Sequence, residues 1–274
     1  MRRKRGRLAA GAQACAGRGV ADLMGAFGPW VDADALFGQG RRRRLFTPAR
    51  VFWLFLSQVL SPDGSCREAV QRFLAWLSLS GGADASSNTC AYCAARGRLP
   101  MDKLQEAQDA LAGRAQALAP SKWRWHGRPV KVVDGSGLSM PDTPENQRDY
   151  PQSTKTKTGC GFPEMRITAI FCLATGVLLQ CAKGSRHVAE RTLFRNLWDG
   201  LEPGDVLLAD RGFCGLADFH LLLRRGVDSV MRLHPARAAG VRVIRKLGPG
   251  DTLVHWIKSR TRPKWLTPEE WDAI

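Results

Sequence analysis

The sequence contains no long hydrophobic run, which argues against a membrane-spanning segment. Its longest stretch of bulky apolar residues, Val51–Leu60, is broken by Ser57 and Gln58 and is too short to cross a bilayer. The basic N-terminus is followed by alanine and glycine rather than large apolar side chains, so a basic arm is a better interpretation than a signal peptide. We therefore expect a cytoplasmic protein without a membrane partner.

Acidic residues are also scarce. The chain has 25 Asp and Glu against 41 Lys and Arg, which gives a formal net charge of +16. Such an excess favours a polyanionic partner, because contacts with phosphates release counterions. An arginine-rich surface inherited from a GC-rich genome is the alternative explanation. Because eleven basic and three acidic residues fall within residues 1–50, the charge is also clustered. These features predict a nucleic-acid-binding, nucleoid-associated protein.

Four consecutive arginines, Arg41, Arg42, Arg43 and Arg44, form the densest part of this basic region. Four neighbouring guanidinium groups cannot lie in a hydrophobic core. The block is therefore either a solvated turn or a patch that contacts phosphates, and the overall charge favours the second interpretation.

The eight cysteines lack the spacing of a structural zinc site or a disulfide framework. Cys90 and Cys93 have metal-ligand spacing, but no second pair accompanies them. Cysteines inside apolar runs, such as Cys172, are typical of small buried side chains in a reducing compartment. We therefore expect neither zinc nor a disulfide frame.

The first half of the chain is predicted to be helical after a basic, partly disordered arm at residues 1–45. A short helix is expected around Val20–Phe27. Thr47 followed by Pro48 predicts a helix start, Ser65 caps a second helix, and Asp102 caps a third. Residues 46–120 thus form a helical domain with basic surfaces, which is typical of DNA-binding modules.

The second half changes to an alternation of strands and helices. Three strand-like runs come first, then helix, strand, helix and strand, at residues 129–134, 167–173, 177–181, 188–198, 204–210, 216–225 and 228–233. This order predicts an α/β fold at residues 121–235, a ribonuclease H-like mixed sheet with flanking helices. Residues 236–274 contain two further strand-like runs, at 241–247 and 252–257, and are interpreted as the start of a β-rich insertion.

Two aspartates are expected at the ends of neighbouring strands. Asp134 closes the first strand-like run and Asp210 closes the run at 204–210. Adjacent strands lie about 4.8 Å apart, so the two carboxylates can share one or two divalent cations. Hard oxygen ligands suit Mg²⁺ or Mn²⁺, which serve phosphodiester chemistry. An aspartate before glycine is often only a turn residue, so each position also has a purely structural interpretation.

The strings around these aspartates carry a family resemblance. Residues 133–147 and 207–214 resemble the first and second aspartate blocks of bacterial insertion-sequence transposases of the DDE class, in the insertion sequence 4 type. Residues 91–100 are similar to the stretch that precedes the catalytic domain of these enzymes. The resemblance covers residues 45–274 and implies a ribonuclease H-like domain behind a helical domain that binds transposon ends.

The resemblance also implies an activity and its partners. The family cuts double-stranded DNA at transposon ends with Mg²⁺ or Mn²⁺ and then joins the freed 3′-hydroxyl to target DNA. Asp134 and Asp210 carry over as catalytic metal ligands, and Arg211 carries over as a phosphate contact or a surface salt bridge. A homodimer on DNA is one arrangement that we consider.

Other basic side chains are candidates for a DNA channel because they follow Asp134 in loops and at strand edges. They are Lys155, Lys157, Arg166, Lys183 and Arg186. A solvated surface explains each of them equally well. Tryptophans at 123, 125, 198, 256 and 265 are interpreted as core or interface residues rather than as base-stacking platforms.

The sequence departs from the family pattern at the third carboxylate. We find no Tyr-x-x-Arg-x-x-x-Glu-x-x-x-x-x-x-Lys string, so we expect a C-terminally truncated chain with impaired catalysis. Glu269 and Glu270 follow Thr267 as in an ordinary helix start and are poor substitutes. An inactive DNA-binding remnant, which occupies transposon ends or inhibits a full-length transposase, is the alternative. A nuclease that completes its site with Glu190 is a third hypothesis.

Overall fold

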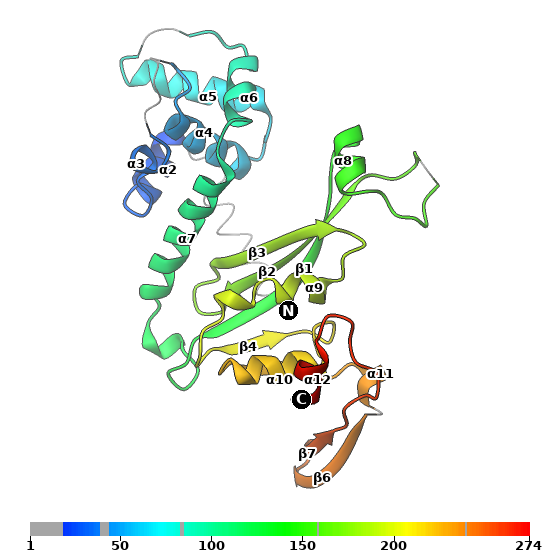
Figure 1. Cartoon of the computed structure of the whole chain (residues 1–274). Helices are drawn as coiled ribbons and strands as arrows, with labels where there is room; N and C mark the ends of the chain where they lie inside the picture. The colour runs from blue at the N-terminus through cyan, green and yellow to red at the C-terminus, as the bar shows by residue number, and fades with distance from the viewer. Residues whose placement is uncertain (1–18, 39–43, 83–84, 158, 239) are drawn as a thin grey trace. The chain divides into compact units, whose positions relative to one another are not determined.

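The computed structural model describes residues 19–38, 44–82, 85–157, 159–238 and 240–274 (Figure 1). The chain divides into two compact units, Met1–Arg114 and Ala115–Ile274. The predicted arm at residues 1–18 and the arginines Arg41, Arg42 and Arg43 lie outside the described residues. Among the helices that are described, none combines the length and apolar character needed to cross a membrane.

The first unit is helical. Its described helices are α2 (Val20–Phe27), α3 (Ala33–Phe37), α4 (Pro48–Leu60), α5 (Cys66–Leu79), α6 (Cys90–Arg96) and α7 (Met101–Ala117), the last of which continues past the division. The predictions of helices at Val20–Phe27 and after Thr47 and Ser65 are confirmed. The expected cap at Asp102 is wrong by two residues, because α7 begins at Met101 and Asp102 lies in its first turn.

Local capping explains why α4 and α5 begin where they do. The Thr47 hydroxyl accepts a hydrogen bond from the Arg50 amide at 3.4 Å, and Pro48 occupies the first helical turn, where its missing N–H costs nothing. The Ser65 hydroxyl accepts from the Glu68 amide at 3.1 Å. Each cap satisfies an amide that the helix itself leaves without a partner.

The helical unit closes around an aromatic core. Leu54, Val70, Phe73 and Tyr92, from α4, α5 and α6, are all fully buried. Phe46 packs against the rings of Phe73 and Tyr92 with centroids 5.5 and 5.9 Å away. Removal of this much apolar surface from water is the main source of the unit's stability.

The second unit mixes strands and helices. Its strands are β1 (Val130–Ser139), β2 (Glu164–Cys172), β3 (Leu178–Ser185), β4 (Val206–Ala209), β5 (Asp228–Met231), β6 (Val241–Gly248) and β7 (Asp251–Trp256). Its helices are η1 (Ser121–Trp123), α8 (Pro144–Asp149), α9 (Glu190–Arg195), η2 (Trp198–Gly200), α10 (Leu216–Arg224), α11 (Pro235–Ala238) and α12 (Pro268–Asp272).

The five-stranded sheet has the order β3-β2-β1-β4-β5. β1 pairs antiparallel with β2 and parallel with β4, whereas β3 and β5 extend the sheet antiparallel and parallel respectively. Three meandering strands followed by alternating helices and strands give this ribonuclease H-like arrangement. The predicted α/β fold class is therefore confirmed.

One face of the sheet carries the helices and a buried ion pair. Lys131 points to this face, where its ammonium group lies 2.6 Å from Asp205 and donates to the Gly200 carbonyl at 2.9 Å. Helices α9 and α10 lie along the sheet in Figure 1 and are joined by an ion pair between Arg195 and Asp218. Both charges of the Lys131–Asp205 pair are buried, so each needs the other as a partner, and the pair joins β1 to the residue before β4.

The opposite face of the sheet is more exposed. Val130, Val206, Leu208 and Val230 share this face, because they occupy paired positions in β1, β4 and β5. With Trp123, Arg124, Trp125 and Leu173 they line a hollow of about 450 Å³. The side chains of Trp123 and Trp125 are 53% and 56% exposed. Trp123 and Trp125 are therefore not core residues, and the interface role that the sequence also allowed for them stays a prediction, whereas the buried Trp198 is a core residue as predicted.

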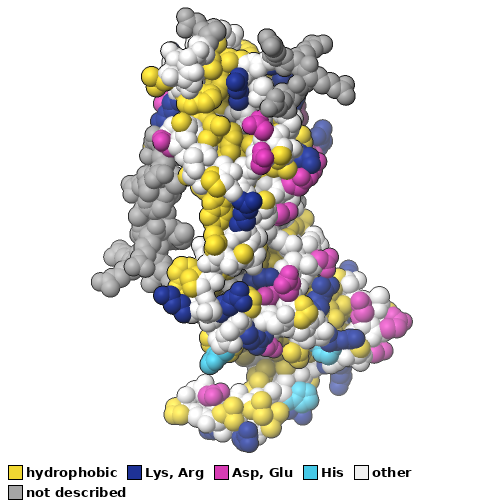
Figure 2. Space-filling view, turned by 90° about the vertical axis from the view of Figure 1, so that its left-hand side faces the viewer, with side chains coloured by type: hydrophobic (Ala, Val, Ile, Leu, Met, Phe, Trp, Pro, Cys, Tyr) yellow, Lys and Arg dark blue, Asp and Glu magenta, His cyan; other side chains and the backbone are white. Residues whose placement is uncertain are grey.

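Strands β6 and β7 form a separate antiparallel hairpin, at the bottom of Figure 1. Its exposed apolar side chains are Val243, Ile244, Leu247, Leu253 and Val254. At the bottom of Figure 2, hydrophobic side chains in yellow lie next to basic ones in dark blue. The two strand-like runs predicted after residue 240 are therefore confirmed as strands.

Candidate functional site

The pairing of β1 with β4 brings the two predicted aspartates to the same edge. The parallel register runs from Val130 opposite Val206 to Val132 opposite Leu208. Continuation of this register by two residues places Asp134 opposite Asp210, which directly follows β4. Neighbouring strands are about 4.8 Å apart, so both carboxylates project from adjacent positions.

The exact place of Asp134 differs from the prediction. It does not close β1, which continues to Ser139 through its pairing with β2. Asp134 instead lies at the point where the shorter strand β4 ends. The expectation failed because the glycines and serines after Asp134 have low strand propensity, and pairing with β2 overrides that propensity.

Both carboxylates are exposed and are oriented by backbone amides. Asp134 Oδ1 accepts a hydrogen bond from the Gly135 amide at 2.8 Å, and Asp210 Oδ1 accepts from the Gly212 amide at 2.7 Å. Side chains alternate along a strand, so Asp134 and Asp210 lie on the same face as Val132 and Leu208. This is the more exposed face of the sheet.

Glu190 lies on the other face of β1. A Cβ atom added to Gly135 would come within 2.8 Å of the Glu190 carboxyl carbon, so Glu190 packs over Gly135. Because Gly135 and Asp134 are consecutive, they face opposite sides of the strand. Glu190 also pairs with Arg166 at 3.8 Å. Glu190 therefore contacts residues on the helix-covered face of the sheet and does not point toward Asp134 and Asp210.

The donor set at the edge of the sheet is made only of carboxylate oxygens. Such donors fit Mg²⁺ or Mn²⁺, which prefer hard oxygen ligands, better than they fit zinc. In the part of the chain that the structure describes, no group of three or more His, Cys, Asp or Glu side chains is placed to hold a metal. Asp134 and Asp210 are the two carboxylates that the continued β1–β4 register brings to this edge.

The segment after Asp210 is held firmly in place. Phe213 and Cys214 are buried, and the Phe213 ring meets Phe194 edge to face with centroids 5.4 Å apart. Arg237 Nη1 donates to the Arg211 carbonyl at 3.3 Å. Burial and the nearby charge of Arg191 lower the pKa of Arg237. These contacts fix the backbone that carries Asp210.

A buried carboxylate that the sequence analysis missed lies behind this segment. Asp218 is fully buried and forms ion pairs with Arg191 and Arg195 of α9, the latter at 2.8 Å. A buried charge needs such partners, because its transfer from water is costly. The only local signal in the sequence was the i,i+4 spacing of Arg191 and Arg195, which places both on one helix face but does not indicate which carboxylate they contact.

The predicted DNA-contacting residues differ in their surroundings. Lys155, Lys157, Lys183 and Arg211 are exposed, as is Arg44, the member of the arginine block that the structure describes. In contrast, Arg166 and Arg186 form ion pairs with Glu190 and Glu164. The exposed side chains are therefore the better candidates for contacts with phosphates.

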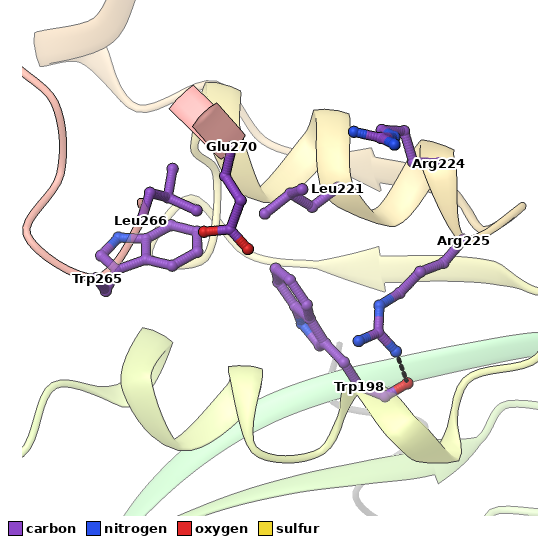
Figure 3. Close-up of a pocket in the computed structure, with 7 residues that line it drawn as sticks. All are labelled: Trp198, Leu221, Arg224, Arg225, Trp265, Leu266 and Glu270. Atoms are coloured by element: carbon purple, nitrogen blue, oxygen red, sulfur yellow. Dashed lines mark hydrogen bonds between the residues drawn. The ribbon is translucent and has the colours of Figure 1, made fainter. Parts of the chain in front are cut away.

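The α/β unit also contains a cavity of about 380 Å³ between η2, α10 and α12 (Figure 3). It is lined by Trp198, Leu221, Arg224, Arg225, Trp265, Leu266 and Glu270. Glu270 accepts from the Thr267 amide at 2.8 Å, which confirms the predicted helix start. Arg225 donates to the Trp198 carbonyl and pairs with Asp199. Arg225 and Glu270 are thus engaged in these contacts, and the residues of α10 that line the cavity belong to the C-terminal half of that helix.

Comparisons with known proteins agree with this arrangement. A family model described as "Transposase DDE domain" matches residues 125–273. Two relatives from Escherichia coli (strain K12) are the "Transposase InsG for insertion sequence element IS4", 26% identical over 140 residues, and the "Putative transposase InsZ", 26% identical over 181 residues. The matches cover 51% and 63% of this chain, and 31% and 56% of the relatives.

A solved structure is also similar in part. It is described as "Cryo-EM structure of piggyBac transposase synaptic complex with hairpin DNA", and the match has a TM-score of 0.36 and 11% sequence identity. It covers 76% of this chain and 47% of that chain. The family model spans more than half of the residues and includes both candidate aspartates. The chain belongs to the family of transposases with a DDE domain.

Proposed function

We propose that the chain acts in DNA transposition through a metal-dependent site formed by Asp134 and Asp210. The observation that carries the proposal is the parallel register of β1 and β4, which places the two aspartates opposite each other. Asp134 and Asp210 would hold Mg²⁺ or Mn²⁺ through carboxylate oxygens. When bound, the cation supplies a more reactive attacking oxygen and stabilises charge on the leaving oxygen of a phosphodiester.

The protein's own contribution is position and charge. The amides of Gly135 and Gly212 orient the carboxylates, and the contacts of Phe213 and Arg237 hold the segment after Asp210. Lys155, Lys157 and Arg211 would contact the phosphates of double-stranded DNA, at transposon ends and in target DNA. With a net charge of +16, binding should weaken steeply as the salt concentration rises.

The helical unit is proposed to bind DNA as well. Exposed Arg44, together with Arg98, lines a hollow of about 660 Å³ in this unit. Two arginines beside such a hollow are suited to contact the phosphate backbone. The arginines at 41 to 43 precede Arg44 directly in the sequence and would add to this charge.

A second candidate function is a DNA-binding remnant without cleavage. It is favoured by the absence of a third acidic ligand among the described residues and by the position of Glu190 on the other face of β1. Such a protein would occupy transposon ends, or inhibit a full-length transposase, and leave the DNA intact.

A cleavage assay distinguishes these functions. The purified chain is incubated with Mg²⁺ or Mn²⁺ and a duplex that carries the inverted repeats flanking its own gene. We expect strand cleavage that falls to background in Asp134→Asn and in Asp210→Asn, because each change removes a metal-binding oxygen. Asp149→Asn is the matched control, since this exposed carboxylate on α8 lies outside the β1–β4 register.

Each other outcome has a defined meaning. Tight, salt-sensitive binding without cleavage would refute the first proposal and support the DNA-binding remnant. Cleavage that is lost in Glu190→Gln would support the third hypothesis, in which Glu190 completes the site. Cleavage that both aspartate variants retain would refute the proposed site.

A further inference from the structure

A buried polar cluster in the helical unit has no part in the proposed function. At its centre Gln58 of α4 accepts hydrogen bonds at Oε1 from the Tyr92 hydroxyl at 2.6 Å and from Arg96 Nη1 at 3.0 Å. Gln58 Nε2 donates to the Gly64 carbonyl at 2.7 Å. Tyr92 and Arg96 belong to α6, so the cluster joins α6 to α4 and to the loop before α5. Two residues of the string at 91–100, Tyr92 and Arg96, contribute to this cluster.

Two cysteines are part of this cluster. Cys66 is the first residue of α5, and its sulfur receives hydrogen bonds from Gln58 Nε2 and from Arg96 Nη1, each at 3.5 Å. Cys93 lies one turn before Arg96 on α6 and therefore faces the same side of that helix as the guanidinium that reaches the Cys66 sulfur. Both cysteines are partly buried and free, whereas Cys90, one turn earlier on α6, is exposed. Residues 27 positions apart thus present adjacent sulfur atoms.

The surroundings of the two sulfurs give them different chemistry. Burial opposes ionisation of Cys66, but the hydrogen bonds from Cys93 and Gln58 and the charge of Arg96 outweigh it and lower the pKa of the Cys66 thiol. The hydrogen bond to Cys66 raises the pKa of Cys93. The thiolate is the reactive form of cysteine. Cys66 is therefore the attacking sulfur, and Cys93 is placed to resolve the product.

We propose that Cys66 and Cys93 form a reversible disulfide, which joins the start of α5 to α6, on contact with a small-molecule disulfide. The Cys66 thiolate attacks one sulfur of the reagent, whose other half leaves as a thiolate and takes up a proton. Cys93 then loses its proton to solvent and attacks the Cys66 sulfur, which releases the second half as a thiol. Two electrons pass from the cysteines to the reagent, which is reduced to two thiols.

The test uses the reduced full chain and glutathione disulfide as the probe. Peptide mass mapping should find a Cys66–Cys93 link with a loss of two hydrogen atoms, and dithiothreitol should reverse it. Cys90→Ala should form the same link. Cys93→Ala should stop at a mixed disulfide between Cys66 and glutathione, because the resolving thiol is missing.

The role of Arg96 gives a second measurement. Alkylation of Cys66 by iodoacetamide near neutral pH should be several-fold slower in Arg96→Gln and should recover in Arg96→Lys, with Cys90 as an internal reference. A Cys90–Cys93 link, a link between two chains, or glutathione on Cys90 alone would overturn the proposal. The proposal also fails if Cys66 of the unaltered chain reacts no faster than Cys90.

Discussion

The two units of the chain differ in how completely they bury their apolar surface. In the helical unit, Leu54, Val70 and Phe73 are fully buried within one aromatic cluster. In the α/β unit, helices cover one face of the sheet, while Val230 on the other face is 60% exposed. Asp134 and Asp210 share that second face. The helical unit thus closes around one aromatic core, whereas the α/β unit leaves one face of its sheet accessible and carries the candidate site there.

The largest expected effect is the difference in folding stability lost when a buried core side chain and an exposed side chain of the sheet are each truncated. Phe73→Ala should destabilise the protein by about 3–5 kcal/mol, because it leaves a cavity in a closed core. Val230→Ala, on the accessible face, should cost less than about 1 kcal/mol. Chemical denaturation of both variants measures the difference. Equal losses would mean that the sheet face is as well packed as the helical core.

The next effect is the stability lost when the buried carboxylate of Asp218, between the helices that cover the sheet, is neutralised. Asp218→Asn should cost about 3 kcal/mol, because it leaves Arg191 and Arg195 without their counter-ion. Asp199→Asn is the matched control, since its side chain is 93% exposed and its pair with Arg225 contributes little. Calorimetry of the two variants compares them, and a small loss in Asp218→Asn would show that the arginines find other partners.

A smaller effect is a loss of stability at alkaline pH, which arises in the helical unit from the buried Tyr92. Burial raises the pKa of Tyr92 to about 12, against an ordinary value near 10. The folded state therefore favours the neutral phenol, so its stability is intact below pH 10 and is lost as pH rises toward 12. The loss should reach about 2 kcal/mol. Alkaline unfolding of a Tyr150→Phe variant, in which Tyr92 is the one tyrosine, measures this loss, and Tyr92→Phe should remove the tyrosine contribution while that of the cysteines and lysines remains.

Much of the α/β unit could be predicted because its strands have strong local signals. The run ending at Ala209 is apolar throughout, and the run at residues 167–173 is rich in β-branched and aromatic side chains. Both became central strands of the sheet. The expectation that Asp134 and Asp210 lie on neighbouring strands came from the predicted order of strands, because that order determines which strands become neighbours in the sheet.

Other features had no local signal. Helix α8 is polar throughout and α6 is only seven residues long, so neither shows an apolar stripe. The Asp218 network joins residues 27 and 23 positions apart, and the cluster around Gln58 joins residues 34 and 38 positions apart. Such contacts are set by tertiary packing, and an isolated sequence segment cannot indicate them.

The unequal lengths of β1 and β4 have a consequence for ligand contact. β1 continues to Ser139, but its pairing with β4 ends at Val132. In the described part of the chain, no strand replaces β4 beside the rest of β1, so this stretch is an edge strand. Backbone amides along such an edge bind water in the free protein. A ligand rich in oxygen acceptors can exchange for that water at amides that the fold leaves unpaired, while the Gly135 amide stays bonded to Asp134.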